Sequence, residues 1–152
     1  MDGEVGRLFG FEAEYREDLH FIPMAIRYRL DLAGWKFSLE SWQRISAADR
    51  FGLLATPVTP EGLRAFGAEL HRLLAGLGVP PPAPAPPSLP AAWGPDEVPE
   101  AVRSACGLAG IVLPEGRWSA LAEIRRYALL KLSRSRHGGG KFKAACEEFG
   151  VG

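Results

Sequence analysis

Apolar residues recur every three to four positions over most of the chain, which is the spacing of one face of an α-helix. The first such stretch begins at Pro23, whose fixed φ suits an opening turn, and stops before Gly34, a natural left-handed end. It predicts a helix over 23–33. Its expected core-facing positions are Ile26, Leu30 and Ala33. The positions expected mostly away from the core are Arg27, Arg29 and Asp31.

Capping residues mark the starts of the next three helices. Ser38 precedes a predicted helix over 39–45, and Ser46, with Asp49 three residues later, precedes another over 47–55. Thr59-Pro60 predicts a helix that continues to about residue 75. The buried stripe expected on this last helix is Leu63, Phe66, Leu70, Leu73 and Leu74.

The C-terminal half shows the same helical period. Pro99 opens a predicted helix that ends near residue 108, and a final helix over 141–149 stops at Gly150. Between them, the pattern predicts one long helix from Trp118 to about Ser133. The buried stripe expected on this long helix is Trp118, Leu121, Ile124, Ala128 and Leu132.

A proline-rich stretch, VPPPAPAPPSLP at 79–90, lies between the two halves. Prolines lack a backbone donor and favour extended polyproline II, so this stretch is expected outside the core. No segment shows the clear alternation of a strand. The sequence therefore predicts an all-α fold: a compact single-domain helical bundle over 1–152, of about six to seven short helices, with 79–95 as a Pro-rich surface linker or loop inside it.

Composition adds the expectation of a folded, cytoplasmic protein. Of the 152 residues, 47% are hydrophobic and 24% are charged, close to the averages for globular domains. The 18 basic and 18 acidic residues balance, so net charge gives no reason to expect nucleic acid or a membrane as partner. The sequence starts without a signal-like apolar region, and no apolar run approaches the roughly 20 residues of a membrane span.

Charge is unevenly distributed along the chain. Residues 1–20 hold six acids and two arginines, whereas 125–143 hold seven basic residues and no acid. Guanidinium groups and the backbone N–H groups of a glycine-rich loop can bind an anion together. The candidate partner- or anion-binding residues, here called the basic segment, are Arg125, Arg126, Lys131, Arg134, Arg136, His137 and Lys141. The other interpretation is a solvated face that complements a helix C-terminus and pairs with the acidic N-terminal residues.

Familiar catalytic and metal-binding motifs are missing from the sequence. There is no GxSxG elbow, the three histidines are far apart, and GGGK lacks the spacing of a phosphate-binding loop. Cys106 and Cys146 belong to no CxxC or Cys/His cluster, so they are interpreted as two plain thiols. An iron–sulfur cluster usually needs four ligands, twice what one chain offers. Neither a metal site nor a resident cofactor is expected.

Two longer segments resemble a known protein family. Residues 9–50 contain F-x-F-E and then L-x-x-I-P-M-x-I-R-x-R-L-D, and residues 118–150 contain W-x-x-L and then R-Y-A-L-x-K-L-S-R. In this order, the two segments resemble the nitrate reductase-associated protein family. The family-motif residues selected as candidates are Glu12, Pro23, Arg27 and Asp31.

The resemblance implies an accessory protein of bacterial nitrate assimilation, typical of cyanobacteria and associated with molybdenum-cofactor genes. It implies no catalysis. The expected function is a non-catalytic accessory or maturation factor for active assimilatory nitrate reductase, with the reductase or its maturation machinery as partner. The chain would act by protein–protein contact or by handling the anionic, molybdopterin-type cofactor of the reductase through the basic segment.

Two other classes of function stay open. A regulatory module could bind a small anion or nucleic acid through the basic segment, and such binding should saturate and depend on salt. A small enzyme could assemble a site from dispersed residues, which would require a deep pocket that joins them. Those residues are Glu12, Arg27, Asp31, Lys131 and His137.

Overall fold

The structure, a computed structural model, describes residues 5–135 and 139–151 of the chain. Over these residues the chain is mostly helical, with a single two-stranded sheet, so the predicted all-α class is confirmed. Within the described residues the chain forms eight α-helices, compared with the six to seven expected. The chain separates into two compact units, Met1–Leu89 and Pro90–Gly152. The expectation that 1–152 forms one domain stays a prediction.

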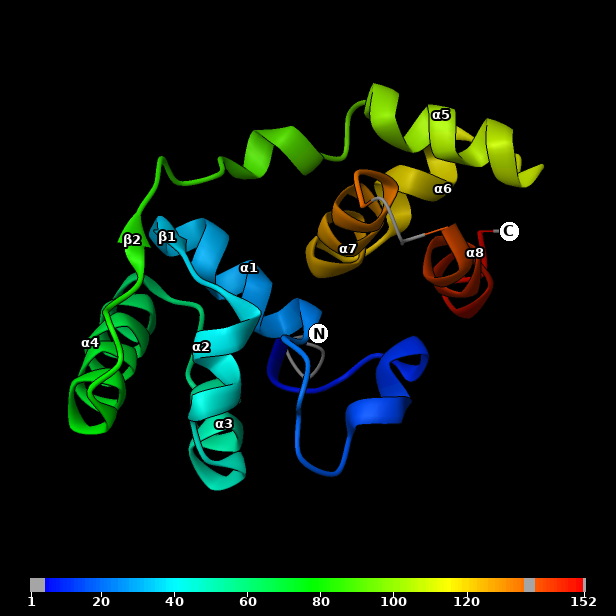
Figure 1. The fold of residues 1–152 in the computed structure, drawn as a ribbon. Helices are drawn as coiled ribbons and strands as arrows, with labels where there is room; N and C mark the ends of the chain where they lie inside the picture. The colour runs from blue at the N-terminus through cyan, green and yellow to red at the C-terminus, as the bar shows by residue number, and fades with distance from the viewer. Residues whose placement is uncertain (1–4, 136–138, 152) are drawn as a thin grey trace. The chain divides into compact units, whose positions relative to one another are not determined.

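The first unit is built around helix α1 (Met24–Ala33), which packs against α3, α4 and strand β1 (Figure 1). Its largest fully buried side chains include Trp42, Phe66, Leu70 and Leu74. The other elements of this unit are the 3-10 helix η2 (Gly10–Tyr15), β1 (Trp35–Lys36), α2 (Leu39–Arg44), α3 (Ala47–Leu54), α4 (Pro60–Leu77) and β2 (Ala83–Pro84).

The helix boundaries in this unit follow the capping residues that the sequence offers. The hydroxyls of Ser38, Ser46 and Thr59 each accept a hydrogen bond from the backbone N–H three residues later. Gly34 ends α1 with a φ of 85°, and a Cβ at this position would lie 2.9 Å from the Ala85 carbonyl oxygen. These predicted caps are confirmed, and only glycine fits the end of α1.

The prediction that Arg29 lies away from the core is wrong. Arg27 and Asp31 are half-buried, but Arg29 is 1% exposed. Arg29 follows Ile26 by three residues and therefore lies on the same face of the helix. The helical pattern contained this information, but the charge of the side chain hid it.

The proline-rich stretch is partly core, contrary to expectation. Val79 and Pro82 are buried, and β2 pairs antiparallel with β1. The residues between the prolines supply the missing donors: the N–H of Ala85 donates to the Gly34 carbonyl and that of Ser88 to the Asp31 carbonyl, both at 2.9 Å. Proline rings are apolar, so a stretch with enough non-proline N–H groups can pack against the unit.

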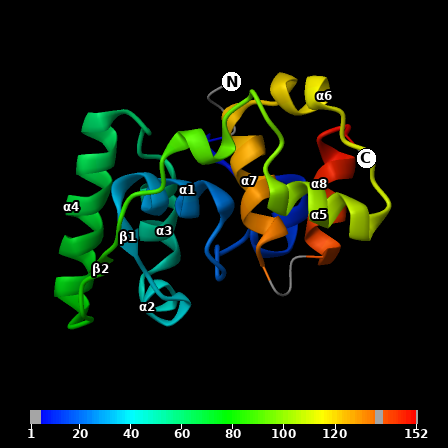
Figure 2. The ribbon, with the colours of Figure 1, turned by 90° about the horizontal axis from the view of Figure 1, so that it is seen from above.

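The second unit surrounds helix α7 (Glu123–Ser133), which packs against α5 and α8 (Figure 2). Most residues of α7 are buried, and burial on nearly all sides marks it as the central helix. The other elements are the 3-10 helix η3 (Pro90–Trp93), α5 (Glu100–Ala109), α6 (Glu115–Ala120) and α8 (Gly139–Glu148). Gly110 and Gly150 follow α5 and α8 with φ of 71° and 74°.

The long helix predicted from Trp118 is wrong, because the chain breaks there into α6 and α7. Leu121 and Ala122 have extended backbone angles, with ψ of 146° and 151°. The Leu121 carbonyl accepts a hydrogen bond from the Arg126 guanidinium instead of continuing the helix. The expected stripe is buried throughout all the same, because both helices direct it to one core.

Candidate functional site

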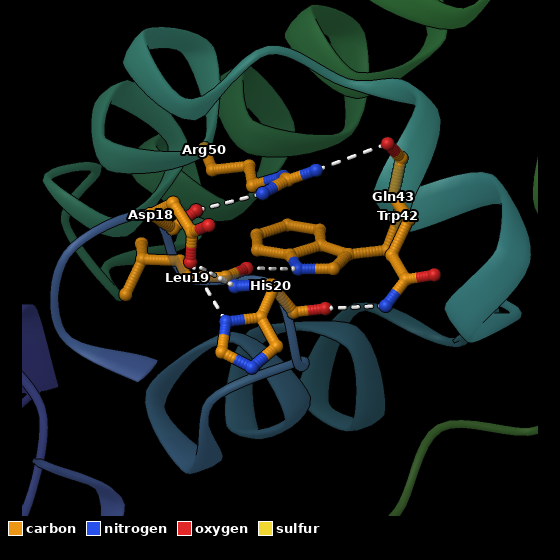
Figure 3. A network of polar contacts seen from close by, with 6 residues as sticks. All are labelled: Asp18, Leu19, His20, Trp42, Gln43 and Arg50. Carbon is orange, nitrogen blue, oxygen red and sulfur yellow. Dashed lines mark hydrogen bonds and ion pairs between the residues drawn. The ribbon is translucent and has the colours of Figure 1, made fainter. Parts of the chain in front are cut away.

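Side chains from α2 hold the backbone of the loop between η2 and α1 (Figure 3). The indole N–H of Trp42 donates to the Leu19 carbonyl at 2.7 Å. The amide of Gln43 donates to the carbonyl of the next residue, His20, at 2.8 Å. Two successive peptide groups of the loop are therefore fixed to one helix.

Arg50 of α3 adds a third connection (Figure 3). Its guanidinium donates to the Asp18 carbonyl at 2.7 Å and to the Gln43 carbonyl at 3.0 Å, and it lies 5.9 Å from the centroid of the Trp42 ring. A guanidinium presents its donors in a rigid fork, so it can hold two backbone segments at once. Arg50 thus joins the loop to α2.

The loop passes through Leu19 with a φ of 53°, in the left-handed region. This conformation costs a non-glycine residue about 1–2 kcal/mol. The Leu19 side chain is 0% exposed, and burying a leucine stabilises by about 1.5–3 kcal/mol. Burial therefore outweighs strain, which explains a leucine where glycine would be relaxed.

The fixed loop carries the rings of His20 and Phe21, which pack against the buried ring of Tyr15 in η2. The His20 and Phe21 ring centroids lie 4.7 Å apart, and Tyr15 packs edge-on against both, at 5.8 and 5.5 Å. Phe21 is 42% exposed. His20 Nδ1 lies 2.7 Å from an Asp18 carboxylate oxygen, and this hydrogen bond lowers the pKa of Asp18. The arrangement suits contact with another molecule, because aromatic side chains lose little entropy on binding.

Two family-motif residues shape the start of α1. Glu12 is buried, and its two carboxylate oxygens accept the backbone N–H groups of Phe9 and Met24 at 3.1 and 2.7 Å. One carboxylate therefore ties η2 to the first turn of α1. Pro23 is the residue before that turn, with a φ of −69°.

The other two family-motif residues lie on α1 itself. The Arg27 Nε donates to the Ile22 carbonyl at 3.2 Å, which folds the guanidinium back over the start of the helix. Asp31 is half-buried in the last turn, where its backbone carbonyl accepts the Ser88 N–H. The structure thus brings Glu12, Pro23 and Arg27 together at one end of α1 and places Asp31 near the other end.

Arg29 is a buried cation that the sequence analysis did not select. Its guanidinium donates to the carbonyls of Ala25, Leu54 and Thr56 and to the Thr56 hydroxyl. Burial lowers the pKa of Arg29 to about 10, so the side chain stays charged at neutral pH. The carbonyls at the end of α3 carry partial negative charge and take the place of a carboxylate partner.

Arg126 of the basic segment is buried. Its Nε donates to the Trp93 carbonyl at 2.7 Å, and an Nη donates to the Leu121 carbonyl. Trp118 adds a parallel connection, because its indole N–H donates to the Gly94 carbonyl at 2.8 Å. These bonds hold the segment around η3 against α6 and α7.

The remaining members of the basic segment do not share one surface. The Arg125 guanidinium stacks 4.7 Å from the Phe149 ring centroid. Arg134 follows Arg125 by nine residues, or two and a half helical turns, so the two side chains point to opposite sides of α7. Arg136 and His137 lie outside the described residues. Four cations near the end of α7 and the start of α8, grouped by their place in these helices, are here called the basic face: Lys131, Arg134, Lys141 and Lys143.

Two cavities in the second unit differ in their charge. One, of about 640 Å³, is lined by acidic residues together with Arg126. The other, of about 610 Å³, lies among α5, α7 and α8 and includes Lys143, with no acidic residue in its lining. The acidic residues of the first cavity are Asp96, Glu97, Glu100 and Glu123.

Both cysteines are free and buried, Cys106 on α5 and Cys146 on α8. Burial raises the pKa of Cys146 to about 12 and also raises that of Cys106. Buried protonated thiols are poor nucleophiles.

Metal-ligating clusters and membrane-spanning helices are both absent from residues 5–135 and 139–151. In these ranges no three His, Cys, Asp or Glu side chains are grouped in a way that could hold a metal ion. No described helix combines the length and the apolar character that crossing a bilayer requires.

Comparison with protein families gives a match over nearly the whole chain. The model of the conserved nitrate reductase-associated protein family matches residues 8–149. The comparisons with curated proteins and with solved structures give no match. The matched range contains the motifs of both segments, with Glu12 and Trp42 in the first unit and Trp118 and Arg126 in the second. Because the match extends over nearly the whole chain, the chain belongs to the conserved nitrate reductase-associated protein family.

Proposed function

We propose that this chain is a non-catalytic accessory factor that active assimilatory nitrate reductase requires, and that it acts by protein–protein contact. The observation that carries the proposal is the family match over residues 8–149, since the family description names an association with nitrate reductase. A protein associated with the reductase is a different molecule from the reductase itself, which supports an accessory role.

The hydrogen bonds of the buried charged side chains support a function in protein–protein contact more than a function in catalysis. Four charged side chains are buried among the described residues, and each one holds backbone groups of neighbouring segments. A catalytic acid or base needs a side chain directed at a substrate in a cavity. These four are Glu12, Arg29, Arg50 and Arg126.

The basic face is the surface that we propose for the partner. Arg134 and Lys143 are exposed, and Lys131 and Lys141 are half-buried at the junction of α7 and α8. Clustered cations attract an acidic protein surface and speed its association. The same charges would suit an anionic molybdopterin group, so handling of that cofactor belongs to the same proposal.

The test is made in cells that grow on nitrate as their nitrogen source. Deletion of the gene should lower nitrate reductase activity, and the intact chain should restore it. Reversal of the basic face by Arg134→Glu with Lys141→Glu should restore less activity. The matched control, Lys36→Glu with Arg44→Glu, reverses two exposed charges of the first unit and should restore full activity.

Two results would contradict the proposal. Full reductase activity after deletion would show that the chain is not required. Activity of the isolated chain on nitrate would show that it is an enzyme. Reductase protein and molybdenum content, measured in the same cells, separate loss of folding from loss of cofactor insertion.

The regulatory alternative uses the same four cations and needs a separate measurement. Nitrate, phosphate, molybdate and a short DNA duplex are titrated into the purified chain at low and high salt. Saturable, salt-dependent binding that is lost in the Arg134→Glu, Lys141→Glu variant would favour a sensor or nucleic-acid-binding module. Absence of saturation leaves protein contact as the function of the face.

A further inference from the structure

We infer that the groove among α5, α7 and α8 docks an amphipathic helix of a partner protein, with carboxylates along one flank of that helix. The inference rests on the proposed function, because it names the surface and the kind of segment through which contact is made. All the residues involved belong to the second unit.

The groove is a formed cavity with walls from three helices. Its volume is about 610 Å³. One wall is α5, and the opposite walls are the end of α7 and the first turns of α8. Because α7 packs against both α5 and α8, the walls are held in place before any partner arrives.

The α5 wall is apolar and unusually exposed. Leu108 lines the groove and is 93% exposed, and Val112, just beyond the end of α5, is 82% exposed. Ala101, Ala105 and Ala109 also line the groove, four residues apart on one face of the helix. A partner that covers such an exposed apolar side chain removes apolar surface from water, which stabilises the complex.

The charge of the groove points to an acidic partner. Lys143 is the ionisable residue among those that line the groove, and Arg134, next to the lining residues Ser133 and Ser135, is also exposed. A partner with acidic side chains beside its apolar stripe complements this surface, whereas a basic partner would be repelled.

The shape of the wall favours a helix as the occupant. Alanines at four-residue spacing form a shallow face, and side chains of this size allow two helix axes to approach closely. A helix that lays an apolar stripe into a groove anchors itself through residues three, four and seven positions apart. Leu108, seven residues after Ala101 on α5, extends the apolar surface along the same face as the alanines.

The test uses two fluorescent peptides and the full-length chain. Each peptide is a designed amphipathic helix about five turns long with a leucine stripe, flanked by glutamates in one and by lysines in the other. Binding is measured by fluorescence anisotropy at two salt concentrations. The glutamate peptide should bind saturably, more weakly at high salt, and the lysine peptide should bind at least about tenfold more weakly.

Single substitutions locate the binding site. Leu108→Glu should weaken binding of the glutamate peptide about tenfold or more, because burial of a leucine exceeds the free energy of a tenfold change in affinity. Lys143→Glu should weaken it severalfold and remove the salt dependence. The matched controls are Leu89→Glu, at a position 68% exposed in the first unit, and Lys36→Glu, and both should bind as the unchanged chain does.

Each contrary result overturns the inference. The groove is not the docking site if neither peptide binds, if both bind equally, or if Leu108→Glu and Leu89→Glu bind alike. Self-association of the chain that Leu108→Glu abolishes would show that a second copy occupies the groove. Circular dichroism verifies that the variants are folded, which these exposed positions permit.

The peptides contain no part of nitrate reductase, so the two proposals can fail separately. Peptide binding without any dependence of the reductase on the chain would leave the groove as a docking site and refute the proposed function. Dependence of the reductase without peptide binding would keep the function and refute the groove.

Discussion

Leu19 offers a direct test of the balance between backbone strain and side-chain burial. In the middle of a helix or strand, glycine is less stable than alanine by about 0.5–1 kcal/mol, because glycine loses more backbone freedom on folding. At a φ of 53° this order should reverse, since glycine relieves about 1–2 kcal/mol of strain that alanine keeps.

The expected magnitudes follow from two substitutions at this position. Leu19→Ala removes a side chain that is 0% exposed and should destabilise the chain by about 2–5 kcal/mol. Leu19→Gly loses the same contacts but relieves the strain, so it should be about 0.5–1 kcal/mol more stable than Leu19→Ala. Urea unfolding followed by far-ultraviolet circular dichroism gives both free energies, and equal m-values show that the denatured states are comparable.

Leu53 provides the matched control. It is also 0% exposed and lies in the same unit, but inside helix α3, where φ is negative. There Leu53→Gly should be less stable than Leu53→Ala by about 1 kcal/mol. If the glycine variant is the less stable one at both positions, the strain assigned to Leu19 is wrong.

Three further predictions concern other buried groups. Glu12→Gln should destabilise the chain by about 1.5–3 kcal/mol, because the amide offers one acceptor oxygen where the carboxylate offers one to each of the two backbone N–H groups. An unchanged free energy of urea unfolding would contradict this. Gly62→Ala should lower the melting temperature, because the added Cβ would clash with the Pro57 carbonyl oxygen. Gly52→Ala has open space around its Cβ and should raise the stability of the chain by about 0.5–1 kcal/mol. A similar change in both variants would refute the clash. Burial raises the pKa of Cys146 to about 12, so the folded chain keeps a proton that the unfolded chain loses above pH 9, and stability should fall by about 1.4 kcal/mol per pH unit between pH 9 and pH 12. Cys146→Ala should remove that part of the slope in urea unfolding series, and an unchanged slope would show that the thiol ionises equally in both states.

The helices could be predicted from the sequence because their signals are local. Ser38, Ser46, Thr59 and Gly34 act within one turn of the residues that they cap, and the structure confirms each of them. The family could also be predicted, because two motifs in a fixed order along the sequence can be identified without knowing how the chain folds.

The errors arose where a distant segment decides the local structure. The break between α6 and α7 depends on the side chain of Arg126, which binds the Leu121 carbonyl and, at the same time, the Trp93 carbonyl. Burial of Arg29 depends on the carbonyl groups at the end of α3. In each case the partner is a backbone carbonyl, which every residue type has, so no sequence pattern marks the partner, although helical spacing marks the face on which Arg29 lies.

The same reasoning explains why two charged candidate residues bind backbone groups of the chain itself. Glu12 and Arg126 have the charges of site residues, but their groups are occupied by the backbone of neighbouring segments. A side chain that fixes backbone in this way reduces the freedom that a surface loses on binding, and so strengthens contacts in which it takes no part. If the second unit binds a partner through its groove, Arg126→Lys should therefore weaken binding of the glutamate peptide, although Arg126 is buried. Partial recovery of the peptide affinity at lower temperature would distinguish lost rigidity from a lost contact.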